Sequence, residues 1–357
     1  MAKKKQTKFK ESVGIDIGTH SIKLVHLKKI HDGFKLLNYE IRPTVPAGVE
    51  YIPSDLRRDR YAPILAEMLR TLKINPRKVK HLVSSIGGDH VSIKQIKTIF
   101  LPEDELESAL FFEAKKHLPI SGSDMLLDFQ VLNVEERTNN MNILLVATTK
   151  DEIAKHNEIL NAVDLAPGIV DAEPLAIANS FIFNAFIEEG VYVVVNLGAH
   201  RSNMVIYGPQ AKFFSRDLAW GGFNITKDIM KKRNLSFEEA EAYKFEYGIT
   251  DNGASASKSQ ELSTLEISDK PTEEQIALEV KRSLRYYVKE AGNSDFRKVL
   301  LVGGSSKLKG LPEYLTEQLN IPTEIFNPFI NLEMPEKLRD KKDPQLALAI
   351  GLAMRPE

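Results

Sequence analysis

The chain has 357 residues and a formal net charge of −1, with 43% hydrophobic and 27% charged residues. This composition is typical of a globular protein of about two to three domains, and its balanced charge argues against a nucleic-acid partner. The lack of cysteine excludes disulfides, thiolate chemistry and cysteine-type zinc sites. No stretch approaches the ~18 apolar residues that a membrane span needs, so we expect a cytoplasmic protein.

The first ten residues contain five lysines, and no apolar segment follows them. They therefore do not form a secretory signal. We expect residues 1–11 to be a basic tail that is either simply solvated or in weak contact with an anionic membrane, worth about 1 kcal/mol per lysine.

Residues 12–78 have the pattern of the first part of an α/β domain. Strands are expected at residues 13–17, 22–27 and 34–41, because apolar runs alternate with the turns Gly-Thr-His-Ser and His-Asp-Gly-Phe. A helix is expected at 60–74, where apolar residues recur at helical spacing before an Asn-Pro pair.

Residues 79–167 are expected to form an inserted αβ module. It would contain two strands around a Gly-Gly-Asp turn and a helix at 102–119 with an acidic first turn and a basic last turn, as the helix dipole favours. A hairpin is expected at 125–150, followed by an amphipathic helix. A further helix is expected at 171–186.

The opening pattern recurs about 180 residues later. The segment VVVNLGAHRSNMVIYG aligns with VGIDIGTHSIKLVHLK, which places Asn196 opposite Asp16 and Gly198 opposite Gly18. A third glycine turn, VGGSSKLKG, lies between an expected strand and an expected helix, where backbone N–H groups favour an anion. Each turn alone is weak evidence, but three in this order predict two similar halves that bind a phosphate.

These motifs resemble those of the actin-like ATPase superfamily, which includes actin, Hsp70, MreB and FtsA. Within it, the segments LPEDELESALFFEAKKHLPI and WGGFNITKDI are similar to the PilM family of type IV pilus assembly proteins. The resemblance implies two related α/β domains around a nucleotide cleft, with an extra αβ subdomain of the FtsA/PilM type. It implies a connecting helix at 168–190, a second domain at 191–343 and a final connecting helix at 344–357. Within the second domain, residues 251–270 are rich in serine and poor in apolar residues, which predicts a mobile loop.

The resemblance further implies that ATP and Mg²⁺ occupy the cleft, with Asp16 holding the metal ion through water. The first loop would bind phosphate through successive N–H groups, hydroxyls and one ammonium group, on Gly18, Thr19, His20, Ser21 and Lys23. The other residues expected at the nucleotide are Asn196, Gly198, Ala199, Gly221, Gly222, Glu279, Lys281, Arg282, Gly303, Gly304, Ser305 and Lys307. For Lys281 a solvated helix face is an equal alternative.

The second loop departs from the superfamily pattern. Active members usually carry an aspartate where this chain has Asn196, and Gly-Gly-x-Thr where it has Gly-Ala-His-Arg. Arg201 would either contact phosphate or point to solvent, and Glu173 would either orient the attacking water or serve as a helix cap or salt bridge. Because phosphoryl transfer depends on charge stabilisation, we expect ATP hydrolysis to be weak or absent.

The sequence thus favours a nucleotide-binding scaffold of the pilus inner-membrane platform that recruits the N-terminal peptide of PilN. Other platform proteins and pilus motor ATPases are further candidate partners. The alternatives are an FtsA-like division or filament protein and an active ATPase or kinase. The sequence given ends soon after the last motif, without an FtsA-like amphipathic helix, so we expect a peripheral place at the inner membrane through a partner, with the basic N-terminus as a second possible contact.

Overall fold

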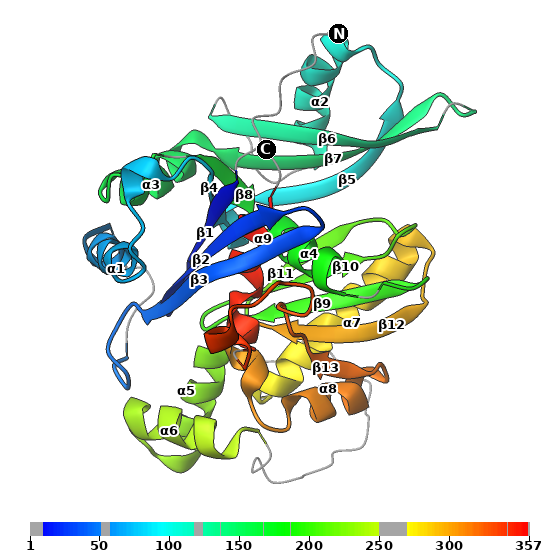
Figure 1. Cartoon of the computed structure of the whole chain (residues 1–357). Helices are drawn as coiled ribbons and strands as arrows, with labels where there is room; N and C mark the ends of the chain where they lie inside the picture. The colour runs from blue at the N-terminus through cyan, green and yellow to red at the C-terminus, as the bar shows by residue number, and fades with distance from the viewer. Residues whose placement is uncertain are drawn as a thin grey trace.

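The structure, a computed structural model, describes residues 10–50, 58–117, 124–135, 137–166, 168–185, 187–249, 270–340 and 342–355. The predicted tail at 1–11 and the predicted loop at 251–270 lie almost wholly outside these residues. The described residues form three sheets, two in the body of the molecule and one in a module above it (Figure 1). Among them, no helix is both long and apolar enough to cross a bilayer.

The first sheet has the strand order β3-β2-β1-β4-β8. Its strands are β1 (Glu11–Ile17), β2 (Ser21–Ile30), β3 (Gly33–Pro43), β4 (Leu82–Ile86) and β8 (Ile169–Ala172). The first three strands form an antiparallel meander, whereas β4 and β8 are parallel to β1.

The second sheet repeats this arrangement in the order β11-β10-β9-β12-β13, with the same strand directions. Its strands are β9 (Val191–Leu197), β10 (Ser202–Tyr207), β11 (Phe214–Leu218), β12 (Phe296–Val302) and β13 (Thr323–Ile325). Asp16 pairs with Lys23 in the first hairpin, and Asn196 pairs with Asn203 in the second. The predicted duplication is therefore confirmed, strand by strand.

Helices cover both faces of the two sheets. They are α1 (Arg58–Thr71), α3 (Lys150–Asn161), α4 (Glu173–Asn184), α5 (Gly222–Arg233), α6 (Phe237–Tyr247), α7 (Thr272–Ala291), α8 (Leu311–Leu319) and α9 (Ala347–Ala353). Short 3-10 turns lie at Pro76–Lys78, Gly88–His90, Gly304–Lys307, Glu336–Leu338 and Pro344–Leu346. Helices α1 and α3 pack on the first sheet, and α7 and α8 pack on the outer face of the second.

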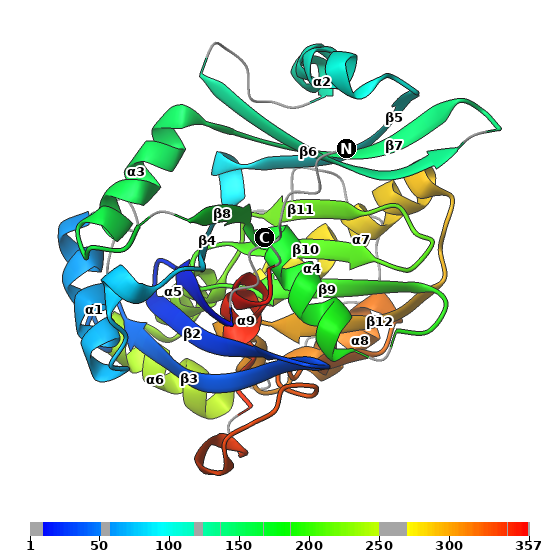
Figure 2. The ribbon, with the colours of Figure 1, turned by 45° about the horizontal axis from the view of Figure 1, so that its top comes forward.

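Helices α4 and α9 lie between the two sheets (Figure 2). Their backbones touch, because a Cβ on Gly351 would lie 1.8 Å from the carbonyl oxygen of Ala176. Likewise, a Cβ on Gly14 in β1 would lie 2.3 Å from the carbonyl oxygen of Ala349 in α9. Glycine at these positions therefore permits the close packing that joins the two halves.

The third sheet has the order β5-β7-β6 and forms a separate layer. Its elements are β5 (Ser92–Ile99), α2 (Glu103–His117), β6 (Met125–Glu135) and β7 (Asn140–Thr149). Leu106 and Leu110 of α2 pack on Ile143 and Leu145 of β7. Figures 1 and 2 both show α2 on the side of this sheet that faces away from the body.

The module expected at 79–167 includes two elements that the structure places with the first sheet. Strand β4 pairs with β1, and Leu160 of α3 is buried against the same core as Leu82 and Ile15. We therefore propose module limits near residues 92 and 149.

Short strands were missed by the sequence prediction. The helix expected at 171–186 begins only at Glu173, because Asp171 and Ala172 are extended and pair with β4. Strands β8, β11 and β13 have five residues or fewer and are stabilised by neighbours distant in sequence.

Candidate functional site

The first hairpin turn is held by hydrogen bonds and carries a buried ion pair. Asp16 is 5% exposed, and its Oδ2 lies 3.0 Å from Nζ of Lys23. The Gly18 N–H donates to the Ser21 carbonyl at 3.2 Å, and a Cβ on Gly18 would lie 3.0 Å from Nζ of Lys23. A neighbouring residue secures the turn, because the Thr44 hydroxyl donates to the Thr19 carbonyl at 2.5 Å.

The second hairpin turn is held against the start of α5. The Gly198 carbonyl accepts from the Gly222 N–H at 2.9 Å and from the Ser305 hydroxyl at 3.1 Å. A Cβ on Gly222 would lie 2.2 Å from that hydroxyl oxygen, and one on Gly221 would lie 2.7 Å from the Ala199 carbonyl oxygen. Small residues thus allow the second turn and α5 to touch through their backbones.

The third turn packs on the end of β9. Gly303 has a φ of +86°, which favours glycine, and a Cβ there would lie 2.5 Å from Oδ1 of Asn196. Its N–H donates to the Pro344 carbonyl at 3.1 Å, and Gly304 lies beside Gln345. Farther along, Lys307 pairs with Asp343 at 3.3 Å. The structure therefore brings the second and third glycine turns together.

Glu173 joins the two halves at the first residue of α4. The Asn203 amide of β10 donates to Glu173 Oε2 at 3.2 Å, and a Cβ on Gly87 would lie 2.2 Å from its Cδ. Burial raises the pKa of Glu173 to about 8, and the nearby carboxylates of Asp16 and Asp217 add to this rise, whereas Lys23 opposes it. Glu173 therefore holds a proton near neutral pH.

An ion pair also crosses between the halves beside Glu173. Arg201 of the second turn pairs with Asp89, which follows β4 and leads into the module. Burial raises the pKa of Asp217, the repulsion of Asp89 adds to the rise, and Arg201 opposes it. The two alternatives for Arg201 were a phosphate contact and a solvent-facing side chain. In the structure Arg201 is partly exposed and pairs with the Asp89 carboxylate.

A polar cluster that the sequence analysis missed faces His20. Lys244 is 6% exposed; its Nζ donates to the Thr226 hydroxyl at 2.7 Å and to the Gly222 carbonyl at 3.3 Å, and it pairs with Glu241. Burial lowers the pKa of His20. The charge of Glu241 opposes this fall and the charge of Lys244 adds to it, so both side chains lie near the first turn.

The signal for this cluster was present in the sequence. Lys244 follows Phe237 and Ala240 at the spacing of one helix face, and both of those residues are buried. A lysine in such a position is rarely buried unless it is paired.

The residues predicted on α7 make different contacts. Glu279 pairs with Arg282 at 2.9 Å and with Arg216 of β11 at 3.4 Å. Arg216 lies beside Met204, on the sheet face packed against α7, whereas Asn203 points to the opposite face. No contact in the described residues joins Glu279, Lys281 or Arg282 to the glycine turns, so their role at a nucleotide stays a prediction.

The residues around Asp16 suit a magnesium ion held mainly by phosphate and water. Among the described residues, no group of three histidine or carboxylate side chains could hold a metal ion by itself. Mg²⁺ often uses only one or two protein carboxylates beside substrate phosphates, and a single buried aspartate satisfies this need.

Comparison with known families gives a match along almost the whole chain. Residues 14–357 match the family described as type IV pilus assembly protein PilM.

Solved structures share the fold. A structure described as the PilM-PilN type IV pilus biogenesis complex is 23% identical, with a TM-score of 0.79 over 97% of this chain and 98% of that chain. The ethanolamine utilization protein EutJ from Carboxydothermus hydrogenoformans is 16% identical, with a TM-score of 0.54 over 97% and 90% of the two chains. A diol dehydratase-reactivating factor in nucleotide-free form is 12% identical, with a TM-score of 0.53 over 96% and 99%. The fold is the predicted actin-like ATPase fold.

Proposed function

Because this chain belongs to the PilM family of type IV pilus assembly proteins, we propose that it binds ATP with Mg²⁺ between its halves and recruits the N-terminal peptide of PilN. One observation carries the nucleotide part of this proposal. Two hairpins share a common register, the first carries the buried Asp16, and Glu173, whose pKa is raised mainly by burial and also by Asp16, accepts a hydrogen bond from Asn203 in the second. Such turns present N–H groups to phosphate oxygens.

Each side chain has a defined task in this proposal. The N–H groups of residues 18–20 bind phosphate, Lys23 supplies a point charge, and Asp16 holds the hydrated metal ion. Bound Mg²⁺ would neutralise negative charge on the phosphates. Lys244 and Glu241 form a polar wall opposite His20, and we add them to the candidate nucleotide-binding residues.

The same geometry supports slow hydrolysis. The second hairpin has a neutral pair, Asn196 and Asn203, where the first has Asp16 and Lys23. The pKa of Glu173 is about 8, so near pH 7 its carboxyl group keeps its proton and is a poor base towards water. We propose a turnover well below the roughly 1–100 s⁻¹ of kinases.

Calorimetry on nucleotide-stripped protein tests nucleotide binding. We expect Mg²⁺-ATP to bind, Asp16→Asn to weaken binding at least about tenfold, which is 1.4 kcal/mol, and Asp164→Asn to leave it unchanged. Asp164 is a suitable control because it forms only a surface pair with Arg77. Correctly folded wild-type protein that releases no heat with Mg²⁺-ATP would contradict the proposal.

We place the PilN peptide between the module and the first half. Strands β6 and β8 are both edge strands, and the pKa of Asp171 in β8 is raised mainly by burial and also by Asp128 in β6, so these edges lie near one another. Arg355 opposes this rise and pairs with Asp171 at 3.1 Å. An extended peptide can add to such an edge through backbone hydrogen bonds, while alternate side chains fill pockets. This contact would bring the protein to the inner membrane through its partner.

A synthetic PilN N-terminal peptide tests this placement by titration. Leu126 lies on β6 with 38% of its side chain exposed and points away from α2, towards the body. We expect Leu126→Arg to weaken binding at least about tenfold. The matched control is Phe112→Arg on α2, which is 64% exposed on the far side of the same module and should bind normally. Equal loss in both variants, or none in either, would move the peptide elsewhere.

A further inference from the structure

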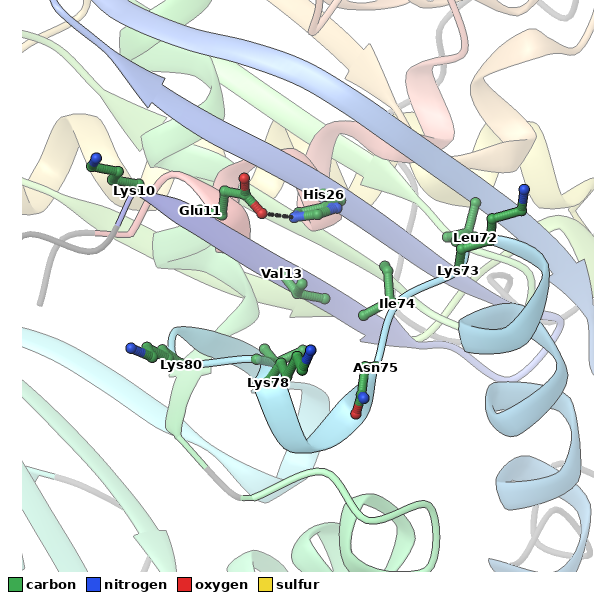
Figure 3. Close-up of a pocket in the computed structure, with 11 residues that line it drawn as sticks. Lys10, Glu11, Val13, His26, Leu72, Lys73, Ile74, Asn75, Lys78 and Lys80 are labelled. Atoms are coloured by element: carbon green, nitrogen blue, oxygen red, sulfur yellow. Dashed lines mark hydrogen bonds and ion pairs between the residues drawn. The ribbon is translucent and has the colours of Figure 1, made fainter.

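A basic pocket lies on the first half, lined by the start of β1, by β2 and by the segment from 72 to 80. Its volume is about 600 Å³. Figure 3 shows Val13 and Ile74 between the strand that carries Lys10 and the turn that carries Lys78. Neither the nucleotide site nor the proposed peptide site uses these residues.

The rim of this pocket is strongly cationic. Lys10, Lys73, Lys78 and Lys80 line it and are exposed. Within the described residues, none of these four ammonium groups has a carboxylate within ion-pair distance. The acidic residue of the lining, Glu11, lies 3.1 Å from His26, so it is turned towards its own strand pair.

One further lysine extends the same charge. Lys28 is exposed and lies opposite Glu11 in the β1–β2 pair, on the same strand face as His26.

The pocket floor is apolar. Val13, Leu72, Ile74 and Val79 contribute aliphatic side chains below the lysines. The site therefore combines a ring of positive charge with a hydrophobic base, which suits an anionic group attached to an apolar part.

We propose that this pocket and its lysine rim bind the anionic headgroups of an acidic phospholipid membrane. The four rim lysines have exposed ammonium groups on long side chains and come from two chain segments. This arrangement suits a surface that carries many phosphates better than one defined anion. Lysines near an anionic bilayer each strengthen binding about fivefold, and the effect declines within a Debye length. The membrane thus contacts the protein directly, in addition to any tether through PilN.

Vesicle sedimentation with the full-length protein tests this proposal. We expect binding to vesicles of equimolar phosphatidylcholine and phosphatidylglycerol, and little binding to phosphatidylcholine alone. The triple variant Lys73→Gln, Lys78→Gln, Lys80→Gln should lower the partition coefficient on the order of a hundredfold. These residues are exposed, so the fold should be retained.

A matched triple variant separates the pocket from net charge. Lys231→Gln, Lys232→Gln and Lys289→Gln remove the same charge from exposed positions on α5 and α7, and binding should change less than about twofold. The proposal is overturned if wild-type protein ignores acidic vesicles or if both triple variants lose binding equally. It is also overturned if removal of residues 1–9 alone abolishes binding while the pocket variant binds normally, or if an acidic peptide binds the pocket and vesicles do not.

The vesicles contain neither nucleotide nor pilus protein. A negative result here therefore leaves the proposed ATP and PilN functions standing, and a failure of those functions leaves the lipid result interpretable.

Discussion

The two central hairpins have the same backbone register, but one carries a charged pair of side chains and the other a neutral pair. In both, a strand ends in a glycine turn of the form Gly-x-His, and a second strand returns in the same register. The first hairpin pairs Asp16 with Lys23, whereas the second pairs Asn196 with Asn203. A shared fold thus fixes where side chains point, and the residue types decide that the first hairpin pairs two charged side chains where the second pairs two neutral amides.

The largest expected effect comes from breaking the charged pair. Asp16→Ala leaves Lys23 without its partner at a site where both side chains are mostly buried. We expect unfolding free energy to fall by about 3 kcal/mol, while Asn196→Ala in the second hairpin costs about 1 kcal/mol. Urea denaturation of both variants measures the difference, and equal losses would mean that the two hairpins are energetically alike.

Glu173, which touches the second hairpin and is repelled by Asp16 of the first, gives a pH test. Its pKa is about 8 in the folded protein against an ordinary 4.5, so the folded state holds a proton that the unfolded state has lost. Stability contributed by this group therefore falls as pH rises from about 4.5 to 8, by at most about 1.4 kcal/mol per pH unit.

Glu173→Gln removes this dependence. Relative to the variant, the wild-type protein should lose about 2 kcal/mol between pH 5 and pH 8, a value reduced for the partial exposure of the side chain. Denaturant melts at several pH values measure the difference. Parallel pH profiles would show that Glu173 is ionised in the folded protein.

Restoring the missing charge sharpens the comparison. Asn196→Asp places a carboxylate beside Gly303, opposite the position of Asp16, and we expect ATP turnover to rise about tenfold, equivalent to 1.4 kcal/mol. Asn203→Asp is the control, because it adds the same charge one strand away and removes the amide that Glu173 accepts from. An unchanged phosphate-release rate in Asn196→Asp would mean that this position does not limit hydrolysis.

The smallest effect concerns the ion pair between the halves. Arg201 and Asp89 have side chains that are 46% and 70% exposed, so Arg201→Ala should change stability by less than about 1 kcal/mol. Because Asp89 already engages the guanidinium, we expect ATP affinity to change by less than about fivefold. A larger loss in calorimetry would identify Arg201 as a phosphate contact.

The sequence by itself determined the repeated local structure. Apolar runs around glycine turns predicted the first strands and the equivalence of Asp16 with Asn196. The acidic first turn and basic last turn of residues 102–119 predicted the helix found at Glu103–His117. These features are local, because strand alternation and turn chemistry depend on residues a few positions apart.

Only the tertiary structure decided which distant residues meet. The raised pKa of Glu173 depends first on burial and then on the carboxylates of Asp16 and Asp217. The polar cluster around Lys244 depends on the approach of α6 to His20. Strand β4 joined the first sheet rather than the module, although it adjoins the module in sequence. The basic pocket forms where Lys10 and Lys80, seventy positions apart in the chain, line the same cavity. Burial and nearby charges shift a pKa through space. The sequence pattern therefore identifies candidate residues but does not show which residues surround them in the fold.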